Sequence, residues 1–143
     1  MHVMVGTDGS EGGDRAVDMA AKFATAAEAK LLVMTVVNSD IEQSQDMDKL
    51  ARAEGGMGEA IELAANGILR RAKKRAHRQG AGSVEVQYSW GDPTEAIIET
   101  ALRVKVDIIV VWRRGRGRLA GLLLGSVSQK LVSLAPCAVM VVP

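Results

Sequence analysis

Short apolar runs alternate with helix-like patterns along the whole chain, and no linker separates them. Residues 3–5 form a first apolar run, and residues 31–37 form a nearly continuous one, typical of a strand buried on both faces of a parallel sheet. Between them, apolar residues recur at spacings of three and four from Val17 to Ala27, which predicts a helix capped by Ser10. The first part of the chain therefore predicts a strand, a helix and a second strand.

The middle of the chain repeats this alternation after a polar interruption. Residues 38–58 are polar, acidic and glycine-containing, so we expect an irregular segment with at most a helical turn. An apolar stripe from Ile61 to Ala76 then predicts a helix that ends near Gly80. Apolar and polar residues alternate over residues 84–90, which is typical of a half-exposed edge strand.

The last part of the chain adds two helices and two strands. Residues 92–95 read Asp-Pro-Thr-Glu, a helix start with a capping aspartate and a proline in the first turn. An apolar strand is expected over residues 108–112, a helix from Ser126 to just before Pro136, and a final strand over residues 138–142.

The sum is an α/β fold, a single three-layer α/β/α domain over residues 1–143 with an open, five-stranded parallel sheet. In folds of this kind, ligands bind at the carboxyl ends of the strands where the winding reverses, which here means strands one and four. The loops over residues 6–10 and 113–126 follow those two strands, so topology alone predicts a site between them.

Composition removes several classes of site. The single cysteine, Cys137, excludes an internal disulfide and a four-cysteine zinc site, and two histidines exclude a dense histidine site. We expect Cys137 to be buried rather than reactive. No apolar run is long enough to cross a bilayer, and no secretory signal is visible, so a cytoplasmic protein is expected.

A basic run over residues 70–78 raises the question of nucleic-acid binding. Ala72 and Ala76 continue the buried stripe of their helix while the charges occupy the rest of the turn, as on a solvated face. No aromatic residue lies among the charges to stack on bases. The pattern therefore favours a solvated helix face over a nucleic-acid site.

The loop before the last helix combines four glycines with four arginines. Its glycines allow main-chain N–H groups to approach an anion, and the helix that begins after Gly125 points its positive end at the same place. The hydroxyls of Ser126 and Ser128 add donors. Loop chemistry alone leaves two readings open, a phosphate site or a solvated loop with a capping serine.

The spacing in this loop resembles a known nucleotide-binding pattern. Gly115, nine further residues and then Gly125 followed by Ser126 match the ATP-binding loop of the universal stress protein family. The resemblance spans the chain and includes residues 5–11, 91–93, 121–128 and 135–137. It implies the strand order 3-2-1-4-5, usually homodimers, and ATP or a related adenine nucleotide, with or without magnesium.

The resemblance also implies which residues bind the nucleotide. Asp8 resembles the acidic residue beside the nucleotide, and Val37 resembles the position whose backbone recognises adenine. Asp8 has an alternative role, because an aspartate in such a turn often bonds only nearby backbone N–H groups. The full expected set is Thr7, Asp8, Val37, Arg114, Gly115, Gly125, Ser126, Val127 and Ser128.

One residue departs from the family pattern. Trp112 stands where the family has its first motif glycine. Its indole is expected to block the pocket, swing aside, stack on a base, or fill a cavity left by a lost nucleotide, and the sequence does not choose among these outcomes.

Two functions from different classes follow. The first is a regulatory protein that binds an adenine nucleotide, and the second is a dimeric scaffold that has lost the nucleotide and acts through protein contacts. ATP hydrolysis has little support, because no Ser-His-Asp set and no Gly-Lys-Ser/Thr ending is visible, and no catalytic residue is assigned. The uncharged edge strand over residues 138–142 predicts a homodimer that pairs this strand with its twofold mate.

Overall fold

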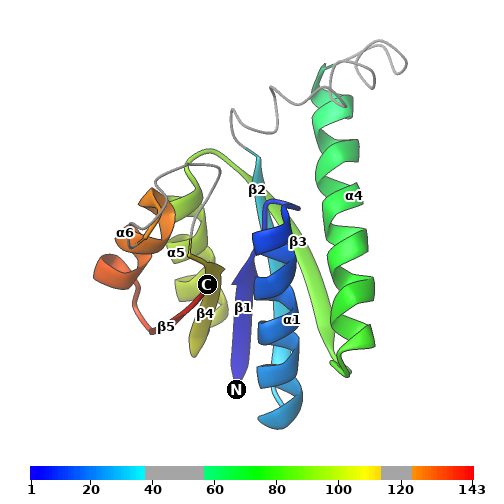
Figure 1. Cartoon of the computed structure of the whole chain (residues 1–143). Coiled ribbons are helices and arrows are strands. Elements are labelled where there is room, and N and C mark those ends of the chain that lie inside the picture. Colours follow the sequence, from blue (N-terminus) through cyan, green and yellow to red (C-terminus); the bar gives the residue numbers. More distant parts are fainter. Residues whose placement is uncertain (38–56, 114–123) are drawn as a thin grey trace.

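The computed structural model describes residues 1–37, 57–113 and 124–143. Their five strands form one parallel sheet in the order 3-2-1-4-5, which confirms the predicted fold class. Helices cover both faces of this sheet (Figure 1). The strands are β1 (His2–Gly6), β2 (Lys30–Val37), β3 (Val84–Trp90), β4 (Ile108–Trp112) and β5 (Ala138–Val142), and the helices are α1 (Glu11–Ala26), α4 (Met57–Arg78), α5 (Pro93–Val104) and α6 (Ser126–Leu134).

The chain winds in opposite directions from the two central strands. β1 pairs with β2 on one side, and with β4 on the other, where Val5 lies opposite Val110. The loops that follow β1 and β4 therefore leave the same edge of the sheet from neighbouring strands. This is the edge at which open α/β sheets bind their ligands.

The apolar core has two parts, one on each face of the sheet. α1 and α4 cover the first, where Val17, Val33 and Leu69 are buried together. α5 and α6 cover the second, which includes Ile97 and Leu131. Because successive side chains of a strand point to opposite faces, each strand contributes alternate residues to the two parts.

Most expected boundaries are confirmed, with two differences. α4 begins at Met57, inside the segment expected to be irregular, because Ala60 and Ile61 pack on Val37. The rest of that segment, residues 38–56, lies outside the described part of the chain. α1 ends at Ala26, so Ala27 is an exposed cap residue.

The expected half-exposed edge strand is β3, which lies at one end of the sheet. Its Val86 and Trp90 side chains are 40% and 54% exposed, so the helices do not fully cover the apolar side of this strand.

In the ranges 1–37, 57–113 and 124–143, no helix has the length and apolarity needed to span a membrane.

Candidate functional site at the carboxyl edge of the central strands

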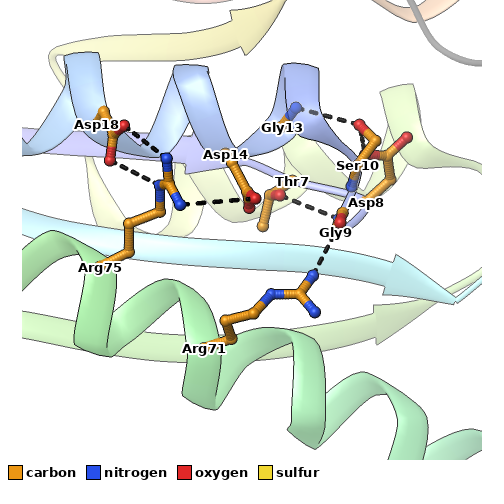
Figure 2. Close-up of polar contacts among 9 residues, drawn as sticks. All are labelled: Thr7, Asp8, Gly9, Ser10, Gly13, Asp14, Asp18, Arg71 and Arg75. Carbon is orange, nitrogen blue, oxygen red and sulfur yellow. Dashed lines mark hydrogen bonds and ion pairs between the residues drawn. The ribbon is translucent and has the colours of Figure 1, made fainter.

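The loop after β1 is closed by hydrogen bonds within itself (Figure 2). Thr7 is buried, and its Oγ1 accepts from the Gly9 N–H at 3.2 Å. Oδ1 of Asp8 accepts from the Ser10 N–H at 2.9 Å and from the Ser10 hydroxyl. The local role considered for Asp8 is therefore present at one carboxylate oxygen. The other carboxylate oxygen of Asp8, Oδ2, takes no part in these two bonds to Ser10.

Ser10 begins α1 as the sequence predicts. Its Oγ accepts from the Gly13 N–H at 3.1 Å, and Glu11 and Asp14 place acidic groups in the first turn. These groups satisfy a first-turn N–H and stabilise the positive end of the helix. The N-terminus of α1 thus receives one hydrogen-bond acceptor and two negative charges from its own side chains.

Two glycines of α1 make close approaches that the sequence analysis missed. A Cβ on Gly13 would lie 2.5 Å from Oγ1 of Thr7, and a Cβ on Gly12 would lie 1.9 Å from the indole of Trp112. Paired glycines in the first turn of a helix are unfavourable without such a reason, and this was the available signal.

The Trp112 side chain lies on the α1 face of the sheet. Its indole covers Gly12 and packs against the core part shared by α1 and α4, and the Arg15 guanidinium lies 5.7 Å from the ring centroid. Val127 and Leu131 of α6 pack in the other core part. The indole and α6 are therefore on opposite faces of the sheet.

At the N-terminus of α6, the cap residue and the first turn do not supply the acceptor and acidic groups found at α1. Gly125 is its cap residue and supplies no side-chain hydrogen bond, and no acidic residue occupies the first turn. The N–H groups of Ser126, Val127 and Ser128 have no carbonyl partner within the helix. This end of α6 therefore combines N–H donors that no carbonyl of the helix satisfies with the positive end of the helix dipole, a combination that binds anions.

Hydrogen bonds to Arg113 hold this helix start against the end of β4. The carbonyl of Arg113 accepts from the Gly125 N–H and from the Ser128 hydroxyl, each at 2.7 Å. Ser128 is 2% exposed, so its hydroxyl serves the loop closure while its backbone belongs to the first turn. Arg114 and Gly115, which were expected in the site, lie outside the described residues.

Val37 ends β2 at the same edge of the sheet. Its side chain is 2% exposed, and its carbonyl accepts from the Gly91 N–H at 3.1 Å. Backbone rather than side-chain atoms are thus what this residue presents.

The expected solvated face over residues 70–78 is confirmed for all its basic residues except Arg75, which is partly buried and paired. Arg75 donates to both carboxylate oxygens of Asp18 at 2.8 and 2.9 Å and lies 3.7 Å from Asp14. The hydrogen bond to Asp18 raises the pKa of the guanidinium above its ordinary value. Arg71 donates to the Gly9 carbonyl at 2.8 Å. Sequence alone does not identify these two residues, because their partners belong to α1 and to its preceding loop.

The other candidate groups in the described part of the chain are Cys137 and the residues that could bind a metal. Cys137 is half-buried, and burial raises the pKa of its thiol. Among the residues that the structure describes, no group of three or more His, Cys, Asp or Glu side chains is placed to hold a metal ion.

Comparison with known proteins gives a consistent result. The profile of the universal stress protein family matches residues 1–143. Universal stress protein Rv1636 from Mycobacterium tuberculosis (strain ATCC 25618 / H37Rv) is 36% identical over 140 residues, which cover 98% of this chain and 94% of that protein.

Solved structures show the same relationship. A universal stress protein crystallised in complex with cAMP is similar at 33% identity and a TM-score of 0.74, covering 99% of this chain and 95% of its own. A universal stress protein from Archaeoglobus fulgidus in complex with dAMP has a TM-score of 0.71 at 19% identity and full coverage of this chain, a likeness of fold.

Proposed function

The chain belongs to the universal stress protein family, and from this premise we propose that it is a regulatory protein that binds an adenine nucleotide. The observation that carries the proposal is the N-terminus of α6, where the cap residue Gly125 supplies no side-chain hydrogen bond and the first turn holds no acidic residue. The related protein in complex with cAMP, at 33% identity over nearly the whole chain, supports an adenine nucleotide as the anion.

The phosphate groups are assigned to the start of α6. The N–H groups of Ser126, Val127 and Ser128 supply donors, and Gly125 allows close approach because it has no Cβ. Arg114 and Gly115 belong to the same proposed site by their place in the family motif. In this arrangement Ser128 contributes its N–H, because its hydroxyl donates to Arg113.

The nucleoside is assigned to the ends of β1 and β2. Oδ2 of Asp8 is an acceptor for a hydroxyl or amino hydrogen, and Thr7 holds the turn that presents it. The base is assigned to the backbone of Val37, whose carbonyl accepts from the Gly91 N–H and has a second lone pair for an amino hydrogen.

ATP with magnesium is the finer form of this proposal. Magnesium is usually bound by substrate phosphates together with one or two carboxylates. Because the Asp8 carboxylate is assigned to the nucleoside, an ion brought by the nucleotide would be held by the phosphates and by water. We also place the protein in the cytoplasm, as its family assignment suggests.

A homodimer through β5 is part of the same proposal. β5 is an edge strand without a charged residue, and such an edge is open to pairing with another chain. Light scattering should give the mass of a dimer at micromolar concentration, and a monomer would contradict this part.

The alternative function, a scaffold without nucleotide, is favoured by a specific observation. Oδ1 of Asp8 and the hydroxyl of Ser128 are already bonded within the protein. Both groups are therefore satisfied without a ligand.

Calorimetry on nucleotide-stripped protein separates the two functions. ATP and cAMP should each be titrated into the wild type and into a variant with Gly125→Val and Ser126→Ala, which crowds the helix start and removes its hydroxyl. We expect binding heat from the wild type and none from the variant. Gly67→Ala is the control, because a Cβ there meets no atom within 4 Å. Absence of heat with the wild type, together with heat in Trp112→Gly, would identify the indole as a block and favour the scaffold.

A further inference from the structure

The loop that carries Asp8 is held from outside by α4 (Figure 2). Nη2 of Arg71 donates to the carbonyl oxygen of Gly9 at 2.8 Å. Gly9 has φ +80°, and a Cβ there would lie 3.0 Å from Nη2 of Arg71 and 3.1 Å from Cγ1 of Ile68. The Gly9 peptide is therefore in close contact with α4, which only a glycine permits without strain.

This contact complements the bonds within the loop. The Gly9 N–H donates to Thr7, and the Ser10 N–H donates to Oδ1 of Asp8, so the loop holds its own shape. Those internal bonds do not fix the loop relative to the rest of the molecule on the α4 side. Arg71 supplies that fixed point, and the guanidinium charge strengthens its hydrogen bond to the carbonyl.

The neighbouring arginines have different roles. Arg75 joins α4 to α1 through Asp18 and Asp14, two and one turns into α1 from the loop. Arg70 is exposed and, within the described part of the chain, makes none of the hydrogen bonds or ion pairs found for the other two. Within this run, Arg71 therefore contacts the loop, Arg75 joins the two helices, and Arg70 makes neither contact.

We propose that Arg71 is a positioning residue for nucleotide binding, which orients the Asp8 loop through the Gly9 carbonyl without touching the nucleotide. The inference rests on the proposed function and adds to it a residue outside the family motif. It also connects α4 to the proposed site. A displacement of this helix would move the Asp8 loop and with it Oδ2 of Asp8, the acceptor assigned to the nucleoside.

The test compares Arg71→Ala, Arg71→Lys and Arg70→Ala by titration with ATP and with cAMP. Arg71→Ala should weaken binding about 3- to 10-fold, the range expected when an exposed, charge-assisted hydrogen bond is lost. Arg71→Lys keeps a cationic donor and should recover most of the affinity. Arg70→Ala should bind as the wild type does. Thermal unfolding of each variant separates loss of affinity from loss of fold, with Arg75→Ala as the comparison for a weakened α1–α4 contact.

A second measurement needs no ligand. Hydrogen exchange of the Gly9 and Ser10 amides reports the loop directly, because both donate to side chains of the same loop. Exchange should be several-fold faster in Arg71→Ala and unchanged in Arg70→Ala.

The outcomes separate the two proposals. Wild-type affinity and wild-type exchange in Arg71→Ala would overturn the role of Arg71 while leaving nucleotide binding in place. Equal losses in Arg71→Ala and Arg71→Lys at unchanged exchange would also overturn it, since they would indicate direct contact with the ligand. A wild type that gives no binding heat would overturn the proposed function, and the exchange rates would then still show whether Arg71 holds the loop.

Discussion

Two helices of this chain begin at the same edge of the sheet and are built in opposite ways. At α1, the Ser10 hydroxyl accepts from a first-turn N–H, two acidic residues follow in the first turn, and Trp112 covers the helix start. At α6, Gly125 supplies no side-chain cap and no acidic residue follows. The first helix start has one N–H group capped and negative charge of its own, whereas the second presents donors and partial positive charge that an anion would satisfy.

α5 shows that α6 is the exception among the helix starts that can be compared. Its cap Asp92 accepts from the Glu95 N–H at 3.0 Å, and Glu95 adds an acidic group to the first turn. α1 and α5 thus share one solution, in which the protein provides the negative charge itself. At α6 this charge is missing, so under the proposed function a nucleotide phosphate would take the place of the side chain.

The largest effect is expected where Trp112 covers α1. Gly12→Ala places a methyl group 1.9 Å from indole atoms, so the helix or the ring must shift. Overpacking of this kind costs about 1–3 kcal/mol, which exceeds the gain of about 0.5–1 kcal/mol from replacing a helical glycine. Urea unfolding should show a lower free energy of unfolding for Gly12→Ala.

A matched variant and a rescue make this result specific. Gly67→Ala, also within a helix but with open space at the Cβ, should raise the free energy of unfolding. Gly12→Ala combined with Trp112→Val should be less destabilised than the sum of the two single variants, because they share one contact. Additive losses would show that the indole does not pack on Gly12.

The next effect comes from making α6 resemble α1. Gly125 has φ −71° and ψ 170°, which any residue adopts, so Gly125→Asp adds a cap without backbone strain. The carboxylate should stabilise the helix by about 0.3–1 kcal/mol and should weaken ATP binding about 10-fold or more by repulsion and competition for the same N–H groups. Calorimetry and thermal unfolding on the same sample measure both changes.

Gly125→Ser gives the neutral control for this variant. It adds a cap without a charge, so its loss of affinity should be smaller than that of Gly125→Asp. A more stable Gly125→Asp protein with unchanged affinity would place the phosphate away from α6.

A smaller effect is expected at the cap of α1. Ser10→Ala removes the acceptor for the Gly13 N–H and a partner of Asp8, and should lower the free energy of unfolding by about 1 kcal/mol. Ser126→Ala is the comparison at α6, where the described structure shows no side-chain cap bond, and stability should change less. Similar losses in both variants would contradict the contrast between the two helix starts.

The fold was predictable because local patterns decided it. The apolar run over residues 31–37 is buried at nearly every position, and the helix starts at Ser10 and Asp92 make the predicted bonds. β3 was less predictable, since Trp90 alternates like a buried residue but is 54% exposed. Alternation gives the face of a strand, and how far a helix covers that face depends on tertiary packing.

The site was predictable only in outline, for a related reason. Topology and motif spacing placed the loop after β1 and the start of α6 at one edge of the sheet. They did not show toward which face the Trp112 side chain points, or that Arg71 and Arg75 have partners on α1 and its preceding loop. Those facts depend on which residues of α1 and its loop face β4 and α4, and no local pattern contains that information.

The smallest effect concerns how α4, which supports the α1 end of the site, is held on the sheet. The Tyr88 hydroxyl on β3 donates to Glu62 of α4 at 3.1 Å, and this bond raises the pKa of the phenol. Because the fold favours the neutral phenol, its stabilisation is present below the unfolded pKa of about 10 and is lost as pH rises through the higher folded value. Tyr88 is the only tyrosine in the chain, so absorbance at alkaline pH reports this group alone.

The titration midpoint of the native protein should therefore lie above the ordinary value for tyrosine. Glu62→Gln should move it back toward that value, because the charged acceptor is lost, whereas Glu59→Gln on the same helix should leave it in place. Circular dichroism over the same pH range verifies that the fold persists through the titration. A midpoint that Glu62→Gln does not change would mean that α4 is held on β3 by its apolar contacts alone, and Arg71 would then act from a helix without this polar link to the sheet.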